Sequence, residues 1–179
     1  DLLGFTTPTA VQSKAIPVML EGHDLLVQAP TGTGKTCAFG IPALEMVQAK
    51  KQTTQVLIVC PTRELVLQTT KVLQDLASRA DGIRVVPIYG GVPIRQQINR
   101  MRNKPHIIVA TPGRLKDHLQ RRTISLANIS LAVLDEADRM LDMGFRKDIQ
   151  FILRDTPKKK QVALFSATIS SEIKKIASQ

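Results

Sequence analysis

Six short runs of consecutive apolar residues recur along the chain, and they constrain its fold more than any other feature. Apolar runs without polar alternation are typical of strands that are covered on both faces. The first run resembles a short buried strand, and the other five are longer. The runs occupy residues 25–27, 56–60, 85–88, 107–110, 131–134 and 162–165.

Helical patterns lie between these runs. The clearest covers residues 63–80, where Leu65, Thr69 and Leu76 fall on one side of a helix and Asp75 falls elsewhere. A first helix is expected at residues 9–20, with Pro17 kinking or ending it. Further helices are expected at residues 37–48, 94–101, 114–121, 145–153 and 171–177. The alternation predicts an α/β fold of three layers, a mostly parallel sheet with helices on both faces.

The segment between the first apolar run and the second helix has the composition of a phosphate-binding loop. Glycines allow backbone N–H groups to turn toward an anion, and the following helix adds the positive end of its dipole. A lysine would reach the phosphates, and a threonine hydroxyl would bind Mg²⁺. The opening position is usually glycine, and the alternative is an ordinary glycine turn with an exposed lysine. The segment reads Ala29, Pro30, Thr31, Gly32, Thr33, Gly34, Lys35 and Thr36.

Polar, turn-forming clusters follow all six apolar runs. Ligands of a parallel sheet bind beyond the carboxyl ends of its strands, so these clusters are expected to share one edge. Besides the glycine loop they are Pro61, Thr62, Arg63 and Glu64; Gly90 and Gly91; Thr111, Pro112, Gly113 and Arg114; Asp135, Glu136, Ala137 and Asp138; and Ser166, Ala167 and Thr168.

Two acids stand directly after the fifth run. Asp135 occupies the position where nucleotide-hydrolysing proteins hold Mg²⁺, and it would complete a metal site with Thr36. Glu136 is suited to orient or deprotonate the attacking water. The alternative interpretation is that the two acids only cap the next helix.

The charge balance indicates a polyanionic partner. Lys and Arg number 25 against 15 Asp and Glu, a net charge of +10, and nucleic acid is the leading candidate. Trp is absent and Tyr89 is the only tyrosine, so contacts to a nucleic-acid backbone are expected more than base stacking. No apolar run approaches the roughly 20 residues of a membrane span, which predicts no membrane partner and an intracellular protein, cytoplasmic or nuclear, with the cytoplasm favoured. Cys37 and Cys60 are expected to pack in the core.

Taken together, these motifs resemble the first RecA-like domain of DEAD-box ATP-dependent RNA helicases. The resemblance covers nearly all 179 residues, with a P-loop sandwich fold. Gly4, Phe5, Pro8, Thr9 and Gln12 resemble the Q motif at 4–12, and residues 29–36 resemble the Walker A variant of the family, in which Ala at the first position is ordinary. Residues 61–65 resemble motif Ia, 90–91 the double-glycine motif, 111–114 motif Ib, 135–138 motif II and 166–168 motif III.

The resemblance implies roles for these residues. ATP and Mg²⁺ are the implied cofactors, and Gln12 would read the adenine edge. ATP would be bound by Phe5, Pro8, Thr9, Gln12 and residues 29–36, with Lys35, Asp135, Glu136, Ser166 and Thr168 serving catalysis and Thr36 and Asp135 holding the metal. The backbone of RNA, read independently of sequence, would be contacted by Pro61, Thr62, Arg63, Gly90, Gly91, Thr111, Pro112, Gly113 and Arg114.

Two departures and two alternatives accompany this interpretation. Val66 replaces the usual Ala of motif Ia, a change expected to be silent, and the upstream aromatic that stacks on adenine is not found. The chain is expected to be a piece of a longer protein whose second RecA-like domain completes the ATP site, so this piece should bind nucleotide weakly, hydrolyse little and unwind nothing. The alternatives are a nucleotide-gated RNA clamp without productive unwinding and a DNA-directed superfamily 2 translocase.

Overall fold

The computed structural model describes residues 7–30, 34–80 and 82–178. Six strands form one sheet in the order β1-β6-β5-β2-β4-β3, and every neighbouring pair is parallel. The expected mostly parallel sheet is therefore entirely parallel in the described part of the chain. The strands are β1 Leu25–Gln28, β2 Val56–Val59, β3 Val85–Ile88, β4 Ile107–Ala110, β5 Leu131–Leu134 and β6 Gln161–Ser166.

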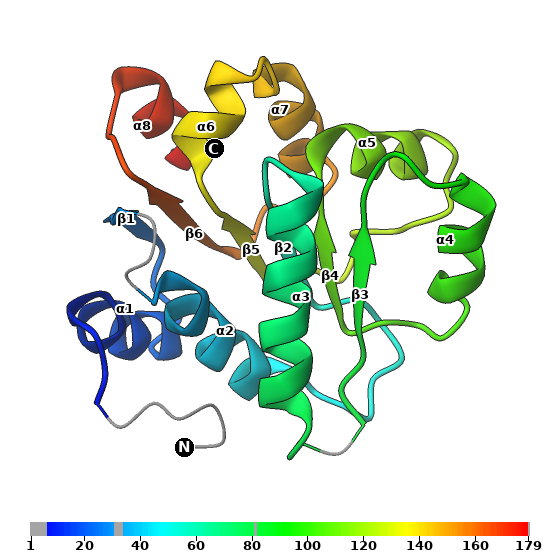
Figure 1. The fold of residues 1–179 in the computed structure, drawn as a ribbon, viewed down its shortest axis with the longest axis horizontal. Helices are drawn as coiled ribbons and strands as arrows, with labels where there is room; N and C mark the ends of the chain where they lie inside the picture. The colour runs from blue at the N-terminus through cyan, green and yellow to red at the C-terminus, as the bar shows by residue number, and fades with distance from the viewer. Residues whose placement is uncertain (1–6, 31–33, 81, 179) are drawn as a thin grey trace.

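In the described parts of the chain, eight helices connect and cover these strands, and Figure 1 shows them as layers on the two faces of the sheet. They are α1 Ala10–Leu20, α2 Lys35–Met46, α3 Arg63–Ala77, α4 Ile94–Met101, α5 Pro112–Gln120, α6 Ala137–Asp142, α7 Arg146–Arg154 and α8 Ser171–Ala177. Helices α1, α2 and α3 pack on one face, and α5, α6, α7 and α8 pack on the other.

Strand β2 shows why the apolar runs do not alternate with polar residues. Leu57 and Val59 belong to the core cluster under α5–α8, whereas Val56, Ile58 and Cys60 belong to the cluster under α1–α3. Each side chain of the strand is fully buried, because both faces are covered by helices. The thiols of Cys37 and Cys60 are buried as expected.

The structure differs from the expectations in three local details. Strand β1 was expected to be buried, but it lies at the edge of the sheet, with Leu25 and Val27 partly buried and Leu26 and Gln28 exposed. Pro17 does not end the first helix, since α1 continues to Leu20. Helix α6 was not among the helices expected from the apolar pattern. Among the described residues, no helix is long and apolar enough to cross a membrane.

Candidate functional site

The expected phosphate loop joins β1 to α2. Ala29 is buried, and its N–H donates to the Ser166 carbonyl at 2.9 Å, which fixes the start of the loop against the end of β6. Gly34 caps α2 with φ +77°, a left-handed conformation that favours glycine. Lys35 and Thr36 form the first turn of α2, at the positive end of the helix dipole. Pro30 is exposed, and Thr31, Gly32 and Thr33 lie outside the described residues.

Gln12 connects the expected adenine-binding segment to this loop. The Thr9 hydroxyl accepts from the Gln12 N–H at 3.3 Å, and the Gln12 Oε1 accepts from the Thr9 N–H at 3.1 Å, a reciprocal cap at the start of α1. The Gln12 Nε2 donates to the Gly34 carbonyl at 3.1 Å. One amide hydrogen and one lone pair remain for a base edge. Pro8 is exposed beside this cap, and Phe5 lies outside the described residues.

Lys35 reaches both expected acids at the end of β5. Its Nζ lies 3.0 Å from Asp135 Oδ1 and 3.4 Å from Glu136 Oε1. Lys35 is only 6% exposed and Asp135 is 0% exposed, so the cluster is sheltered from water. Low local polarity strengthens the attraction between these charges, and the nucleotide loop and the acidic pair therefore form one site.

The Asp135 carboxylate has the properties of a cation ligand. Neither oxygen is aligned for a hydrogen bond with a described residue, the Lys35 contact included, although both are buried. Burial raises the pKa of this carboxyl above its ordinary value, and the Lys35 charge opposes that shift. No group of three or more His, Cys, Asp or Glu among the described residues forms a metal site. Mg²⁺ is commonly held by one or two carboxylates and the phosphates of its substrate, so Asp135 and Thr36 fit such an ion.

Glu136 adopts an unusual backbone conformation. Its φ is +51° and its ψ is +51°, in the left-handed region that costs a side-chain-bearing residue about 1–2 kcal/mol. Arg139, three residues later on α6, lies 3.3 Å from Glu136 Oε2, while Lys35 contacts Oε1. Both carboxylate oxygens are thus held by cations, and the strained turn aims the acid at the end of the phosphate loop.

The serine and threonine that follow β6 contact Asp138 of α6. The Thr168 hydroxyl and N–H donate to Asp138 Oδ2 at 3.1 and 3.2 Å, and the Ser166 hydroxyl accepts from the Asp138 N–H at 3.3 Å. Burial opposes ionisation, but these hydrogen bonds together with the Arg139 N–H lower the pKa of Asp138. Ser166 and Thr168 are therefore connected to the acidic segment through Asp138.

A cavity of about 270 Å³ lies between these elements. The described residues that line it come from the loop, α6 and the end of β6: Ala29, Lys35, Glu136, Asp138, Arg139 and Ala167. Residues of three separate segments converge on one hollow, and the polar side chains come from two of them, Lys35 at the start of α2 and Glu136, Asp138 and Arg139 at α6. A concave site with a few converging polar groups is the usual form of a small-molecule site.

The other expected contact residues gather around Tyr89. The Arg63 guanidinium lies over the Tyr89 ring at 4.9 Å, a cation–π contact. Gly91 has φ +84°, and a Cβ there would lie 3.5 Å from Arg63 Nη1. Thr62 caps α3, its hydroxyl accepting from the Leu65 N–H at 3.2 Å, and Pro61 beside it is buried. The segments after β2 and β3 therefore lie side by side.

Thr111, Pro112, Gly113 and Arg114 form the start of α5, where unpaired backbone N–H groups can face an anion. The Arg114 Nη1 donates to the Val92 carbonyl at 2.9 Å and to the Gln97 Oε1 at 3.2 Å. Arg114 was expected to add charge for RNA. The structure shows that it also connects the start of α5 to the loop after β3.

Four residues of these sites were not found from the sequence. Arg139 could have been found, because it lies three positions after Glu136 on the same helix face. Tyr89, Gln97 and His118, whose Nε2 lies 2.9 Å from Gln97 Oε1, have no local signal, since their contacts join separate elements.

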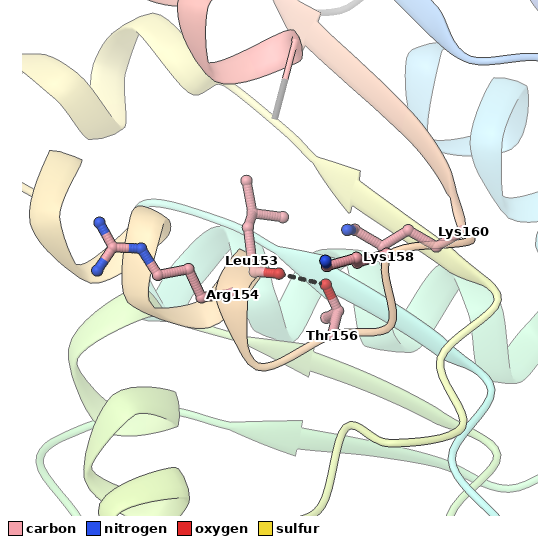
Figure 2. Close-up of a pocket in the computed structure, with 5 residues that line it drawn as sticks. All are labelled: Leu153, Arg154, Thr156, Lys158 and Lys160. Carbon is pink, nitrogen blue, oxygen red and sulfur yellow. Dashed lines mark hydrogen bonds between the residues drawn. The ribbon is translucent and has the colours of Figure 1, made fainter.

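A second hollow lies before the start of β6, away from these sites (Figure 2). It measures about 400 Å³ and is lined by Leu153, Arg154, Thr156, Lys158 and Lys160. In Figure 2 the guanidinium of Arg154 points away from the two lysines, and Lys160 Nζ donates to the Pro157 carbonyl at 3.1 Å. These cationic groups do not converge on one point, so the hollow is not arranged to bind an anion.

The chain is similar to known proteins along nearly its whole length. The model of the DEAD/DEAH box helicase family matches residues 9–176. The chain is 46% identical over 177 residues to the DEAD-box ATP-dependent RNA helicase CshA of Bacillus cereus, covering 99% of this chain and 34% of that protein. It is 48% identical over 176 residues to the ATP-dependent RNA helicase CshA of Limosilactobacillus reuteri, covering 98% and 35%. The chain thus spans about a third of these relatives.

Solved structures show the same fold. The crystal structure of a DEAD box protein from Methanococcus jannaschii matches with a TM-score of 0.94 at 40% identity, covering 99% of this chain and 48% of that one. A hypothetical ATP-dependent RNA helicase from Sulfolobus tokodaii matches with a TM-score of 0.90 at 44% identity, covering 98% and 51%.

Proposed function

This chain belongs to the DEAD/DEAH box helicase family, and we propose that it is the ATP-binding half of an RNA helicase that couples ATP hydrolysis to RNA binding and local duplex unwinding. Residues 1–179 would be the first RecA-like domain, with the Q motif at 4–12, and a second RecA-like domain would complete the enzyme. The observation that carries the proposal is the cluster of Lys35, Asp135 and Glu136 beside the start of α2. A cytoplasmic location belongs to the same proposal.

The cluster has the groups that phosphoryl transfer needs. The Lys35 ammonium, now shared between two carboxylates, would turn toward the β- and γ-phosphates, and Gln12 would read adenine. Mg²⁺ held by Asp135 and Thr36 would neutralise charge on the phosphates. Glu136 would accept the proton of the water that attacks the γ-phosphorus, while the bond from that phosphorus to the bridging oxygen of ADP breaks. Ser166 and Thr168, which bond to Asp138, would couple hydrolysis at the acidic segment to movement of the domains.

The segments around Tyr89 would bind RNA. Arg63 and Arg114 are cationic, and Gly90, Gly91 and Gly113 carry no side chain that would keep a backbone phosphate away. Pro61, Thr62, Thr111 and Pro112 shape the same loops. Contacts of this kind would be independent of base sequence.

The Glu136→Gln substitution tests the proposal in the full-length protein. The amide keeps the size of the side chain but cannot accept a proton, so ATP should still bind while RNA-stimulated hydrolysis falls by about 10²–10⁴-fold. Glu45→Gln, on an exposed position of α2, is the matched control and should hydrolyse normally. Undiminished hydrolysis in the Glu136 variant would contradict the proposal.

Two further measurements separate the helicase from its alternatives. Release of a paired RNA strand after ATP turnover distinguishes unwinding from a nucleotide-gated clamp that holds RNA. Competition between RNA and DNA of one sequence distinguishes it from a DNA translocase through contacts to the 2′-hydroxyl. Glu136 favours the hydrolysing interpretation.

A further inference from the structure

A buried glutamine joins two of the segments that the proposed function assigns to RNA. Gln97 lies on α4 and is only 2% exposed. Its Nε2 donates to the Tyr89 carbonyl at 2.6 Å, and its Oε1 accepts from Arg114 Nη1 at 3.2 Å. One side chain therefore contacts both the segment after β3 and the first turn of α5.

His118 of α5 is a third partner of this amide. His118 is 0% exposed, and its Nε2 lies 2.9 Å from Gln97 Oε1. Because that oxygen can only accept, Nε2 must carry a hydrogen, and Nδ1 can then accept from the Thr123 hydroxyl at 2.7 Å. A flipped Gln97 amide would place its NH₂ group against the Arg114 guanidinium and its oxygen against the Tyr89 carbonyl. Only one orientation of the amide satisfies both of these partners, and the His118 Nε2–H then donates to the same oxygen.

The hydrogen bonds of Gln97 and Arg114 hold the residues on either side of the double glycine. Gly90 and Gly91 lie between Tyr89, whose carbonyl contacts Gln97, and Val92, whose carbonyl accepts from Arg114. The guanidinium of Arg63, on α3, lies over the ring of Tyr89. Gly90 and Gly91 are flexible by nature, so an RNA-binding geometry there needs support from neighbouring groups.

We propose that Gln97 is a positioning residue for RNA binding, holding the loop after β3 and the start of α5 at a fixed separation, with His118 donating to its amide oxygen. The inference rests on the proposed binding of RNA by these two segments. Gln97 and His118 are buried, so neither contacts RNA itself. Their contribution is the spacing between the two segments that meet the RNA backbone.

Gln97→Leu tests the inference, with Gln161→Leu as a matched control. Gln161 is also a buried glutamine whose Nε2 donates to two backbone carbonyls, those of Met19 and His23, but it lies at the start of β6. Both substitutions leave buried carbonyls unpaired and should destabilise the chain. Only the Gln97 substitution should loosen the two loops.

The first measurement is hydrogen exchange without RNA. In the Gln97→Leu chain, amides of residues 89–97 and 111–115 should exchange faster, among them the Thr111 N–H that donates to the Ile88 carbonyl. In the Gln161→Leu chain they should exchange as in the unsubstituted chain. Unchanged exchange at both segments of the Gln97 variant would overturn the inference whatever the RNA result.

The second measurement is the affinity for a fluorescein-labelled oligouridine at several salt concentrations. Gln97→Leu should weaken binding roughly 10-fold, with an unchanged slope of log affinity against log salt, because no phosphate contact is lost. Arg63→Gln should reduce that slope by about 0.7 if its charge meets one phosphate. Equal affinity in the Gln97 variant, or equal weakening by Gln161→Leu, would overturn the inference. If the unsubstituted full-length protein does not bind RNA, the proposed function fails, whereas the hydrogen-exchange measurement tests the contacts of Gln97 separately.

Gln97→Glu serves if the leucine variant does not fold. Glutamate keeps the acceptor that faces Arg114 and His118 but loses the donor to the Tyr89 carbonyl. Exchange should therefore rise at residues 89–92 while residues 111–115 stay protected. Uniform loosening of both segments, or of neither, would contradict the role assigned to the amide.

Discussion

Lys35 offsets the cost of a buried carboxylate. Asp135 is fully buried, and among the described residues the Lys35 ammonium is the cation that contacts it, at 3.0 Å. A carboxylate left unpaired in such a place either costs several kcal/mol or takes up a proton. The same lysine is proposed to bind phosphates, so stability and function depend on one side chain.

Replacing Lys35 by Met should therefore give a loss of stability that depends on pH. The pKa of Asp135 is already raised by burial, and removal of Lys35 raises it further. The folded chain then holds a proton that the unfolded chain releases, so stability falls as pH rises through the interval between the two pKa values. Urea unfolding should show a loss of about 3 kcal/mol near pH 8 and a smaller loss near pH 5.

The double variant Lys35→Met with Asp135→Asn is the control for this prediction. It removes both charges, so its stability should change less with pH between these values than that of the single variant. An equal loss for the single variant at both pH values would mean that Asp135 does not determine the effect.

At the scale of elements, α1 and α2 meet at the phosphate loop. The Thr9–Gln12 cap begins α1, and Gln12 bonds the Gly34 carbonyl where α2 begins. A Cβ on Gly34 would lie 2.6 Å from Gln12 Nε2 and 3.1 Å from the Thr9 methyl. Gly34 is thus required both for its left-handed φ and for the close approach of α1.

Gly34→Ala should separate these two requirements when it is compared with Gly22→Ala. Gly22 has a similar φ of +83°, but no atom lies within 4 Å of a Cβ there. Both variants should lose about 1 kcal/mol to backbone strain. Gly34→Ala should lose about 1 kcal/mol more, since the Gln12 bond breaks, and should bind ATP more weakly by calorimetry. Equal stability and equal ATP affinity in the two variants would contradict the role of the contact.

Sequence patterns predicted the elements well because burial on two faces leaves a simple signal. Strands β2 to β6 lie at the apolar runs, and α4 and α8 have the expected bounds. Strand β1 was misjudged, since Leu25 and Val27 look the same in an edge strand as in a central one. Pro17 is exposed on α1, so the carbonyl it leaves unpaired can reach water and the helix continues. Helix α6 has only six residues, too few for a periodic pattern.

The candidate site was predictable where its residues are neighbours in sequence. Lys35, Asp135 and Glu136 stand in short motifs whose chemistry requires those residue types. Gln97 and His118 could not be found in this way, because each acts through contacts between elements that no local pattern encodes. The left-handed φ of Glu136 is likewise imposed by the turn between β5 and α6.

At the scale of the whole molecule, strand order divides the carboxyl edge of the sheet. Backbone bonds just beyond the strands join Ala29 to Ser166, Asp135 to Val59, Cys60 to Ala110 and Thr111 to Ile88. The neighbours β1, β6 and β5 carry the proposed ATP residues, and β2, β4 and β3 carry the proposed RNA residues. The chain reaches both halves because it runs outward to β3 and then returns (Figure 1).

This division predicts that the 179-residue chain alone does not couple its two ligands. The halves meet through one rigid parallel sheet, and coupling requires an element with two arrangements that both ligands bias. Adding a non-hydrolysable ATP analogue should change oligouridine affinity less than about twofold, equivalent to under about 0.5 kcal/mol.

The chain should bind nucleotide weakly, hydrolyse little ATP and unwind no duplex, because the arginines of a second domain are worth about 10³–10⁵ in rate in related enzymes. Fluorescence anisotropy and a phosphate-release assay, run on this chain and on the full-length protein, check the prediction. Coupling and hydrolysis should appear only in the longer protein, and strong RNA-stimulated hydrolysis by this chain alone would show that its half of the site is already complete.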